Sequence, residues 1–227
     1  QQLYNTVDSL IVGNFLGSSA LAAVSSSGSL IFMLIGFLSG ISAGAGVIVA
    51  RFFGAGDEKN LQRAVHTTVA FGLVAGVLMT GVGVALSPQI LRWMDTPESV
   101  MRESVTYLQI YFAGSLGFVM YNVLVGILQA VGDSRHPLYY LIVSSVINLV
   151  LDLLFITGFH TGVGGAAVAT VISQIVSALL CFWQLLRTKE SYGLKIRKIR
   201  FDKGILVQII KIGLPSGVQN SIIAFAN

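Results

Sequence analysis

The stretch that decides the fold is residues 137–159, which read PLYYLIVSSVINLVLDLLFITGF. An apolar run of about 20 residues is the length that crosses the hydrocarbon core of a bilayer as an α-helix. The run is continuous and lacks the strict alternation of apolar and polar residues that marks a barrel strand of about ten residues. We therefore expect a transmembrane helix here, with Asn148 and Asp152 inside it.

Further apolar runs of similar length extend in both directions from this one. Four are complete, and two shorter ones lie at the ends of the chain. The complete runs are 20–50, 64–87, 105–131 and 163–186, and the partial ones are 2–17 and 205–227. We predict an all-α polytopic membrane protein: a six-helix transmembrane bundle followed by the start of a seventh helix.

Composition supports this prediction. Of the 227 residues, 54% are apolar and only 11% are charged, whereas soluble domains average about 45–50% and about 25%. So few charges cannot cover the surface of a soluble domain, and so apolar a chain is not disordered. The net charge of +4 comes from short basic interruptions rather than a basic stripe, so we expect no nucleic-acid partner.

The basic residues indicate which way the helices run. Cytoplasmic loops of membrane proteins are enriched in lysine and arginine. Of the 14 basic residues, only Arg92 and Arg102 fall on one side of the predicted spans. The other side, which we take to be cytoplasmic, carries Arg51, Lys59, Arg63, Arg135, Arg187, Lys189, Lys195, Arg197, Lys198, Arg200, Lys203 and Lys211. The first, third and fifth spans are then expected to run outward.

The apolar runs and the basic stretch between the last two of them divide the chain into three predicted parts. Residues 1–186 form the transmembrane lobe with a truncated first helix, 187–204 form a basic cytoplasmic linker, and 205–227 begin a seventh helix. The chain starts without a methionine or a basic leader and stops inside an apolar run. We therefore expect no signal peptide and a longer parent protein.

Glycines mark two further features. Gly36, Gly40 and Gly44 are four residues apart and share one helix face, which lets another backbone approach closely; we favour packing within one protomer over dimerisation. The small residues between Ser39 and Gly46 make this region a candidate for a kink.

The segment from Gly54 to Asp57, Gly-Ala-Gly-Asp, matches the GxGD signature of intramembrane aspartyl proteases. Its charged neighbours instead place it in an inner loop, and the segment 130–133 resembles it. In both we predict a tight turn, with Gly at positive φ and Asp starting the next helix. We expect no enzymatic activity.

Two acidic residues lie inside the apolar runs, Asp8 and Asp152. A carboxylate at the centre of a membrane helix costs about 2.5–3.5 kcal/mol on insertion scales, and such residues usually face a wet cavity. Asn148 is four residues before Asp152 and therefore shares its helix face. Their hard oxygen donors suit a proton or Na⁺ and do not suit Zn²⁺ or Cu.

Other polar residues inside the spans are candidates for the same pocket. Asn122 lies in the middle of one predicted span, and Thr170 and Gln174 form a polar i,i+4 pair in another. Taken singly, each more often makes an interhelical hydrogen bond than binds a ligand. As a set they predict a polar interior.

Five ordered segments give the chain a family resemblance. They are spread across nearly the whole chain: Tyr4–Gly13, Val49–Asp57, Leu128–Arg135, Asn148–Asp152 and Gly164–Gln174. They resemble the MATE family, the multidrug and toxic compound extrusion transporters. The resemblance implies a twelve-helix protein of two lobes, with this chain holding the N-terminal lobe. Gly213–Pro215 would then open the second lobe.

The resemblance also implies roles for single residues. In the prokaryotic branch with a cation site in the N-terminal lobe, the acidic positions on the first and fifth helices align with Asp8 and Asp152, and the neighbouring amide aligns with Asn148. Asn122 and Thr170 match polar positions of the same pocket. Tyr4, Asn5 and Gln174 complete the polar lining that we predict.

The expected function is secondary active antiport, in which H⁺ or Na⁺ drives export of a cationic, amphipathic small molecule. Two alternatives stay open: a lipid-linked oligosaccharide flippase of the same superfamily, and a non-transporting membrane scaffold. We expect no cofactor besides the coupling ion, contact with membrane lipid, a monomeric full-length protein, and a multi-pass location in a bacterial or archaeal plasma membrane.

Overall fold

The computed structural model describes the backbone from residue 2 to residue 226; the side chains of residues 1–5, 7, 8 and 224–227 lie outside the described residues. Within that range the chain forms eight α-helices and two short helical segments, with no strand. They are α1 (Gln2–Leu16), α2 (Ser18–Gly54), α3 (Glu58–Trp93), α4 (Glu98–Ala113), α5 (Ser115–Ala130), α6 (Arg135–Leu153), the π-helix η1 (Leu154–Gly158), α7 (Val163–Arg187), the 3₁₀-helix η2 (Ile196–Lys198) and α8 (Lys203–Ala226).

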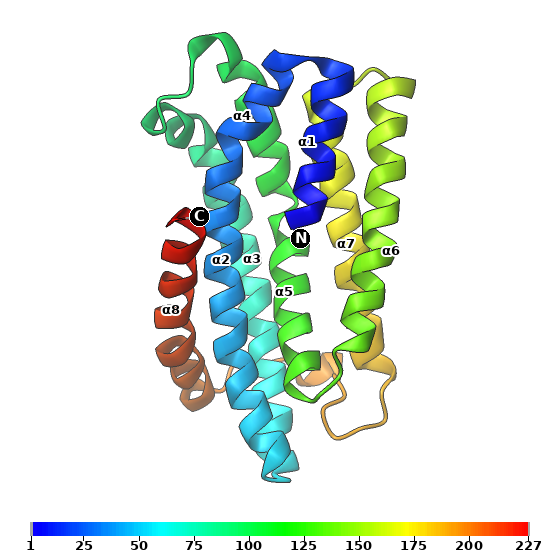
Figure 1. Ribbon diagram of the computed structural model, residues 1–227. Helices are drawn as coiled ribbons and strands as arrows, with labels where there is room; N and C mark the ends of the chain where they lie inside the picture. The colour runs from blue at the N-terminus through cyan, green and yellow to red at the C-terminus, as the bar shows by residue number, and fades with distance from the viewer. Residues whose placement is uncertain (1, 227) are drawn as a thin grey trace.

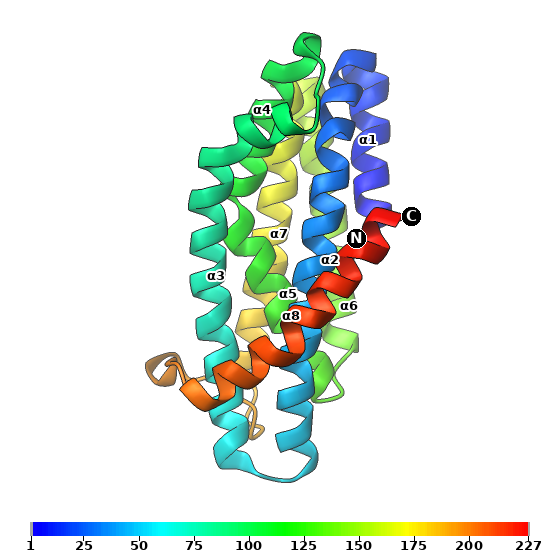
Figure 2. The same ribbon diagram turned by 90° about the vertical axis from the view of Figure 1, so that its left-hand side faces the viewer.

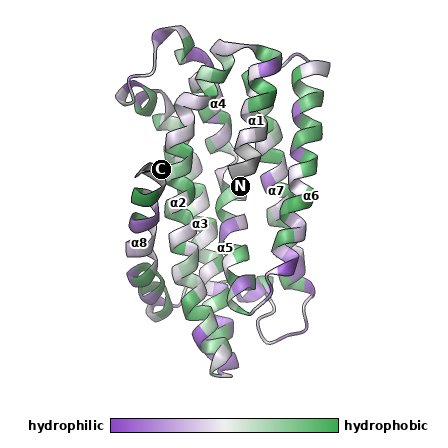
Figure 3. Ribbon diagram, in the orientation of Figure 1, coloured by the Kyte–Doolittle hydropathy of each residue, from purple (hydrophilic) through white to green (hydrophobic). Residues whose placement is uncertain are grey.

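The helices run up and down in one elongated bundle, in which α5 continues in the general direction of α4 (Figure 1). Four of the described helices are long and apolar enough to cross a membrane, or five if α4 and α5 count as one bent span. Hydrophilic residues gather at the two ends of the bundle (Figure 3). The loops at residues 55–57, 131–134 and 188–202 lie together at one end, which we call the basic end. The predicted all-α membrane fold is confirmed.

The third predicted span, 64–87, ends earlier than the helix that contains it. Helix α3 continues through Pro88 to Trp93. Proline cannot donate the hydrogen bond to the carbonyl four residues earlier. The side chain of Gln109 on α4 donates to that carbonyl, on Val84, at 3.4 Å. A neighbouring helix therefore satisfies the group that Pro88 leaves free.

The predicted fourth span is broken at Gly114, where α4 and α5 meet at an angle of 49°. Gly114 packs against Val171 of α7, and a Cβ at this position would overlap the valine side chain. The bend therefore brings the two backbones close together, and α5 continues down the centre of the bundle (Figure 2).

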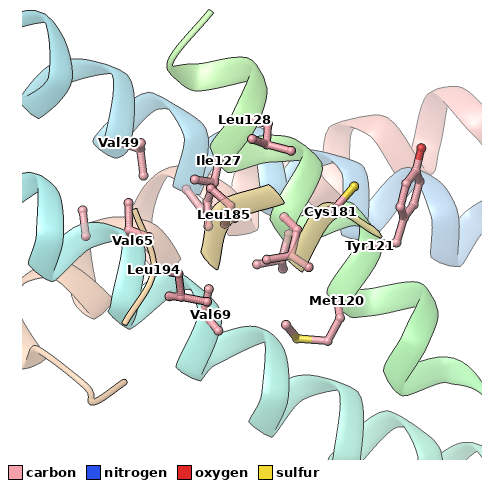
Figure 4. Close-up of a cluster of buried hydrophobic side chains, with 14 of the residues drawn as sticks. Val49, Val65, Val69, Met120, Tyr121, Ile127, Leu128, Cys181, Leu185 and Leu194 are labelled. Atoms are coloured by element: carbon pink, nitrogen blue, oxygen red, sulfur yellow. The ribbon is translucent and has the colours of Figure 1, made fainter. Parts of the chain in front are cut away.

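The main apolar core lies largely in the half of the bundle near the basic end. Figure 4 shows its side chains in close-up. It combines side chains of α2, α3, α5 and α7, including Val65, Ile127, Cys181 and Leu185. Leu194 of the segment between α7 and α8 also belongs to it and is 3% exposed. That segment is thus anchored in the core and is not only a flexible connection between α7 and α8.

Helix α8 packs along α2 and crosses it at an angle (Figure 2). A Cβ on Gly40 would overlap the backbone of Gly217, and a Cβ on Gly44 would overlap that of Gly213. The glycine face of α2 is therefore used within the chain, as favoured from sequence. The expected kink between Ser39 and Gly46 does not interrupt α2, which is a single helix.

Both predicted turns at the basic end are confirmed. Gly56 and Gly132 have φ of 67° and 87°. The Asp57 carboxylate accepts hydrogen bonds from the backbone N–H and the amide of Asn60, at 3.1 and 2.7 Å. Asp57 thereby caps α3 in an inner loop. The segment is a tight turn, as predicted, and does not have the arrangement expected of the protease signature.

Candidate functional site

Asp152 and Asn148 lie on the buried face of α6. Their residues are 0% and 2% exposed, respectively, in a helix whose other face is largely apolar and exposed. The two are four residues apart, so the carboxylate and the amide lie one above the other. The sequence prediction that they share a face agrees with this placement.

The partner of this face is α7, which packs against α6 in an antiparallel hairpin. Thr170 and Gln174 are buried on α7, at 3% and 8% exposed. Thr170 is as far along the chain from Thr161, in the turn, as Asp152 is, and the same holds for Gln174 and Asn148. Counted in residues from the turn, these pairs therefore occupy corresponding positions on the two arms of the hairpin.

In the pair formed by Asn148 and Gln174, two buried polar atoms have no hydrogen-bond partner among the described residues. They are Nδ2 of Asn148, a donor, and Oε1 of Gln174, an acceptor. Buried amides of this kind normally have partners, so each exception calls for an explanation. A water molecule at each group, or the hydration shell of a bound ion, would satisfy it.

Two serines on the same face of α7 were missed from the sequence. Ser173 and Ser177 are buried, and both donate to carbonyls of α7 itself; Ser173 donates to the carbonyl of Thr170 at 2.8 Å. The signal was present, since 170, 173, 174 and 177 follow the 3.6-residue period of one helix face. They make the polar stripe longer than predicted.

The π-helix η1 follows directly after α6, beginning two residues past Asp152. Single π-helical turns are rare and often occur at functional sites, because the extra residue per turn rotates the side chains that follow. Ile156 within η1 is buried in a second apolar cluster, which includes Ile11 of α1 and Ala166 of α7. No apolar pattern in residues 154–158 pointed to this change of helix type.

Helix α1 contacts α2, α6, η1 and α7, so its backbone runs beside the polar face. Positions 4, 5 and 8 lie on this helix. The predicted roles of Tyr4, Asn5 and Asp8 depend on side chains outside the described residues and stay predictions. Ser9, next in the chain, lines a cavity of about 240 Å³ that also includes Ser25, Ser29 and Tyr107.

Asn122 lies elsewhere. It is half-buried on α5, where its amide donates to the carbonyl of Phe118 at 2.9 Å. It lines a cavity of about 520 Å³ between α2, α5 and α6, together with Ser42, Tyr121 and Gln129. The polar residues of α6 and α7 named above do not line this cavity. The predicted polar interior therefore consists of two separate regions.

Comparison with known proteins identifies the family of this helix bundle. The family model named MatE matches residues 1–154. The chain belongs to the MATE family. The MATE chain is thus a multi-pass membrane protein.

Curated relatives of this MATE chain are bacterial multidrug proteins. It is 34% identical to a probable multidrug resistance protein, YoeA of Bacillus subtilis, over all of this chain and 50% of the relative. It is 26% identical to the multidrug export protein MepA of Staphylococcus saprophyticus, over 94% of this chain and 48% of the relative. The chain therefore spans about half the length of these relatives.

Solved structures of MATE family transporters have the same fold as this chain. An inward-facing multidrug resistance MATE family transporter of the MOP superfamily matches with a TM-score of 0.89 and 29% identity, over 98% of this MATE chain and 51% of the other. An outward-facing structure of such a transporter also matches with a TM-score of 0.89, at 28% identity over 99% of this chain and 50% of the other. The fold of this chain corresponds to half of a transporter.

Proposed function

We propose that this chain is the N-terminal lobe of a secondary antiporter that exports a cationic, amphipathic small molecule in exchange for H⁺ or Na⁺. The observation that carries the proposal is the fully buried carboxyl of Asp152, with the Asn148 amide one turn away and the polar face of α7 opposite. Buried ionisable groups inside membrane bundles commonly mark ion pathways. The names of the relatives support multidrug export.

The chemistry of coupling follows from burial. A carboxylate in an apolar bundle is costly, and the cost falls when it takes a proton or a cation. Asp152 supplies the charge, while the Asn148 amide and the Thr170 hydroxyl supply neutral oxygen donors of the kind that Na⁺ accepts. In our proposal Asp8 contributes the second carboxyl from α1.

Transport also requires two states that bind ion and drug differently, since a ligand with equal affinity for both states shifts neither. The chain matches inward-facing and outward-facing structures equally well, each with a TM-score of 0.89. A half that resembles both states supports a mechanism in which the lobes rock as nearly rigid bodies.

The flippase alternative calls for cations that bind a pyrophosphate group inside the bundle. Among the described residues of α2 to α7, arginines and lysines lie near helix ends, and the buried faces of α6 and α7 carry none. This distribution favours a cationic substrate over an anionic headgroup.

The decisive experiment is transport by Asp152→Asn in proteoliposomes that contain the full-length protein. We expect ion-driven efflux of a cationic dye to fall at least about tenfold, because the amide binds neither a proton nor Na⁺ as a charged ligand. The matched control is Asp95→Asn in the outer turn, where φ is 52° and asparagine is well tolerated. It should transport normally.

Undiminished efflux by Asp152→Asn would overturn the coupling role of this residue. A second measurement tests the scaffold alternative. An antiporter should show a rise in its thermal unfolding midpoint with Na⁺ or with falling pH, and Asp152→Asn should remove that shift. A scaffold predicts no specific shift in either protein.

A further inference from the structure

The segment between α7 and α8, residues 188–202, forms one wall of a cavity of about 400 Å³ at the basic end. The first turns of α3 form the other wall. Five cations and one carboxylate are among its lining residues: Lys59, Arg63, Arg197, Lys198, Arg200 and Asp202. Nothing in the coupling mechanism uses this cavity, because residues 188–202 follow the C-terminal end of α7, whereas Thr170 lies in the first half of that helix.

The wall formed by the segment is held in place by side chains of α3. The backbone N–H of Lys195 donates to Nε2 of His66 at 3.0 Å, so Nδ1 carries the proton and donates to the carbonyl of Gln62 at 2.6 Å. The backbone N–H of Asp202 donates to the hydroxyl of Thr67 at 3.0 Å. The two accepting side chains are buried, because His66 and Thr67 are 3% and 0% exposed.

The contacts of two further residues, Gln62 and Leu194, make the segment rigid. The Gln62 amide donates to the carbonyls of Ser191 and Gly193. Leu194 inserts into the main core, and its N–H donates to the carbonyl of Leu185 at 2.8 Å (Figure 4). The cavity is therefore preformed, and a ligand would meet its cations without first ordering a loop.

The charge inside the cavity is poorly balanced. Asp202 is its only carboxylate among the described lining residues, and its nearest approach to Arg63 is 3.9 Å. One oxygen of Asp202 also accepts the backbone N–H of Ile205 at 3.1 Å, where it starts α8. One carboxylate engaged in this way leaves most of the positive charge of the five cations without an ion-pair partner among the residues that the structure describes.

Like charges brought together by a rigid wall repel, and a bound anion removes that cost. Arginine forks match the oxygens of a phosphate group in pairs, and lysines add point charges. The cavity lies where α3 and α8 begin at the basic end, which is the level of lipid headgroups in a bilayer. We propose that it binds a phosphate group, supplied by an anionic phospholipid headgroup or by a soluble phosphate.

The first experiment measures the thermal unfolding midpoint of the full-length protein in detergent with inorganic phosphate, against potassium chloride at equal ionic strength. The second compares nanodiscs of phosphatidylglycerol with nanodiscs of phosphatidylcholine. We expect phosphate, phosphatidylglycerol or both to raise the midpoint, because a ligand that binds only the folded state stabilises it.

The test variant is Arg197→Gln with Arg200→Gln, both exposed on the wall. The matched control is Arg135→Gln with Lys189→Gln, which removes the same charge from exposed positions at the basic end that do not line the cavity. We expect the test pair to weaken binding about tenfold or more, since two charge-assisted contacts are lost, and the control pair to bind as the parent does.

Each result has a defined meaning. A shift with phosphatidylglycerol alone assigns the cavity to a lipid headgroup, a shift with inorganic phosphate alone assigns it to a soluble phosphate, and both together assign it to the shared phosphate group. No shift with either probe overturns the proposal. An equal loss in the test and control pairs also overturns it, because diffuse surface charge would then explain the binding.

Discussion

At the residue scale, two aspartates of this chain show how surroundings decide the role of one side chain. Asp57 is exposed enough to keep its charge and accepts two hydrogen bonds from Asn60, which lower the pKa of its carboxyl. Asp152 is fully buried in the bundle, where charge is costly. The first therefore caps a helix, while the second is the candidate for ion coupling.

The cap at Asp57 predicts a pH dependence of stability. Because the pKa of Asp57 is lowered below its ordinary value of 3.8 in the folded state, its contribution is fully present above about that value and is lost as the pH falls through the folded pKa. Asp57→Asn keeps a capping side chain but cannot titrate. Its thermal unfolding midpoint should match that of the parent near neutral pH and decline less in acid.

Asp57→Ala provides the comparison, because alanine cannot cap α3 at any pH. Its midpoint should be lower than that of the parent at neutral pH and should approach it in acid. If the parent and Asp57→Asn decline equally with acid, hydrogen bonding of the carboxylate by Asn60 does not contribute to stability.

At the element scale, glycines determine how closely two helices approach. Gly40 and Gly44 of α2 meet Gly217 and Gly213 of α8, backbone against backbone. Small residues at such a crossing allow the helices to approach closely inside a membrane. The sequence showed which face of α2 is small, but α8 as its partner depends on how the chain folds back.

Gly40→Ala should destabilise the protein. Its Cβ would overlap the backbone of Gly217, which cannot move aside as a flexible side chain can, so we expect a cost of about 1–3 kcal/mol. The control is Gly28→Ala on the same helix, where a Cβ meets nothing within 4 Å. Thermal unfolding in detergent should show a lower midpoint for Gly40→Ala and an unchanged or slightly higher one for Gly28→Ala. Equal midpoints would mean that the crossing does not contribute to stability.

At the scale of the whole molecule, the segment between α7 and α8 links the lobe to the helix that follows it. From the sequence it is a basic linker, and linkers rich in charge are usually extended and mobile. In the structure it is fastened to α3 by His66 and Thr67 and to the core by Leu194. Motion of α8 relative to the lobe is therefore restrained at the basic end.

Leu194→Ala should release this segment. Removing a buried leucine side chain costs about 2–5 kcal/mol, and here the loss falls on a loop that carries Arg197 and Lys198. We expect trypsin to cleave the loop several times faster than in the parent protein. Ile196→Ala is the control in the same loop, since Ile196 is 60% exposed, and its cleavage rate should stay that of the parent. Equal rates in all three proteins would show that Leu194 does not hold the loop.

Much of the fold follows from the sequence alone. Long apolar runs determine the spans, the sorting of basic residues separates the two ends of the bundle, and Gly-Ala-Gly-Asp determines a capped turn. The pairing of Asn148 with Asp152 also follows, because positions four apart on a helix share a face. Each of these properties depends on neighbours within a few residues or on transfer of a segment into lipid, so local sequence is sufficient.

Other properties depend on residues far apart in the chain. Gln109 satisfies the carbonyl that Pro88 leaves free, so α3 continues past residue 87, where the apolar run ends. Asn122 lines a cavity that the polar stripe of α7 does not line, and cations from two distant segments, 59–63 and 197–200, line one cavity at the basic end. The sequence determined which residues are costly in a membrane; only the tertiary structure decided which of them meet, because those contacts are set by how whole helices pack.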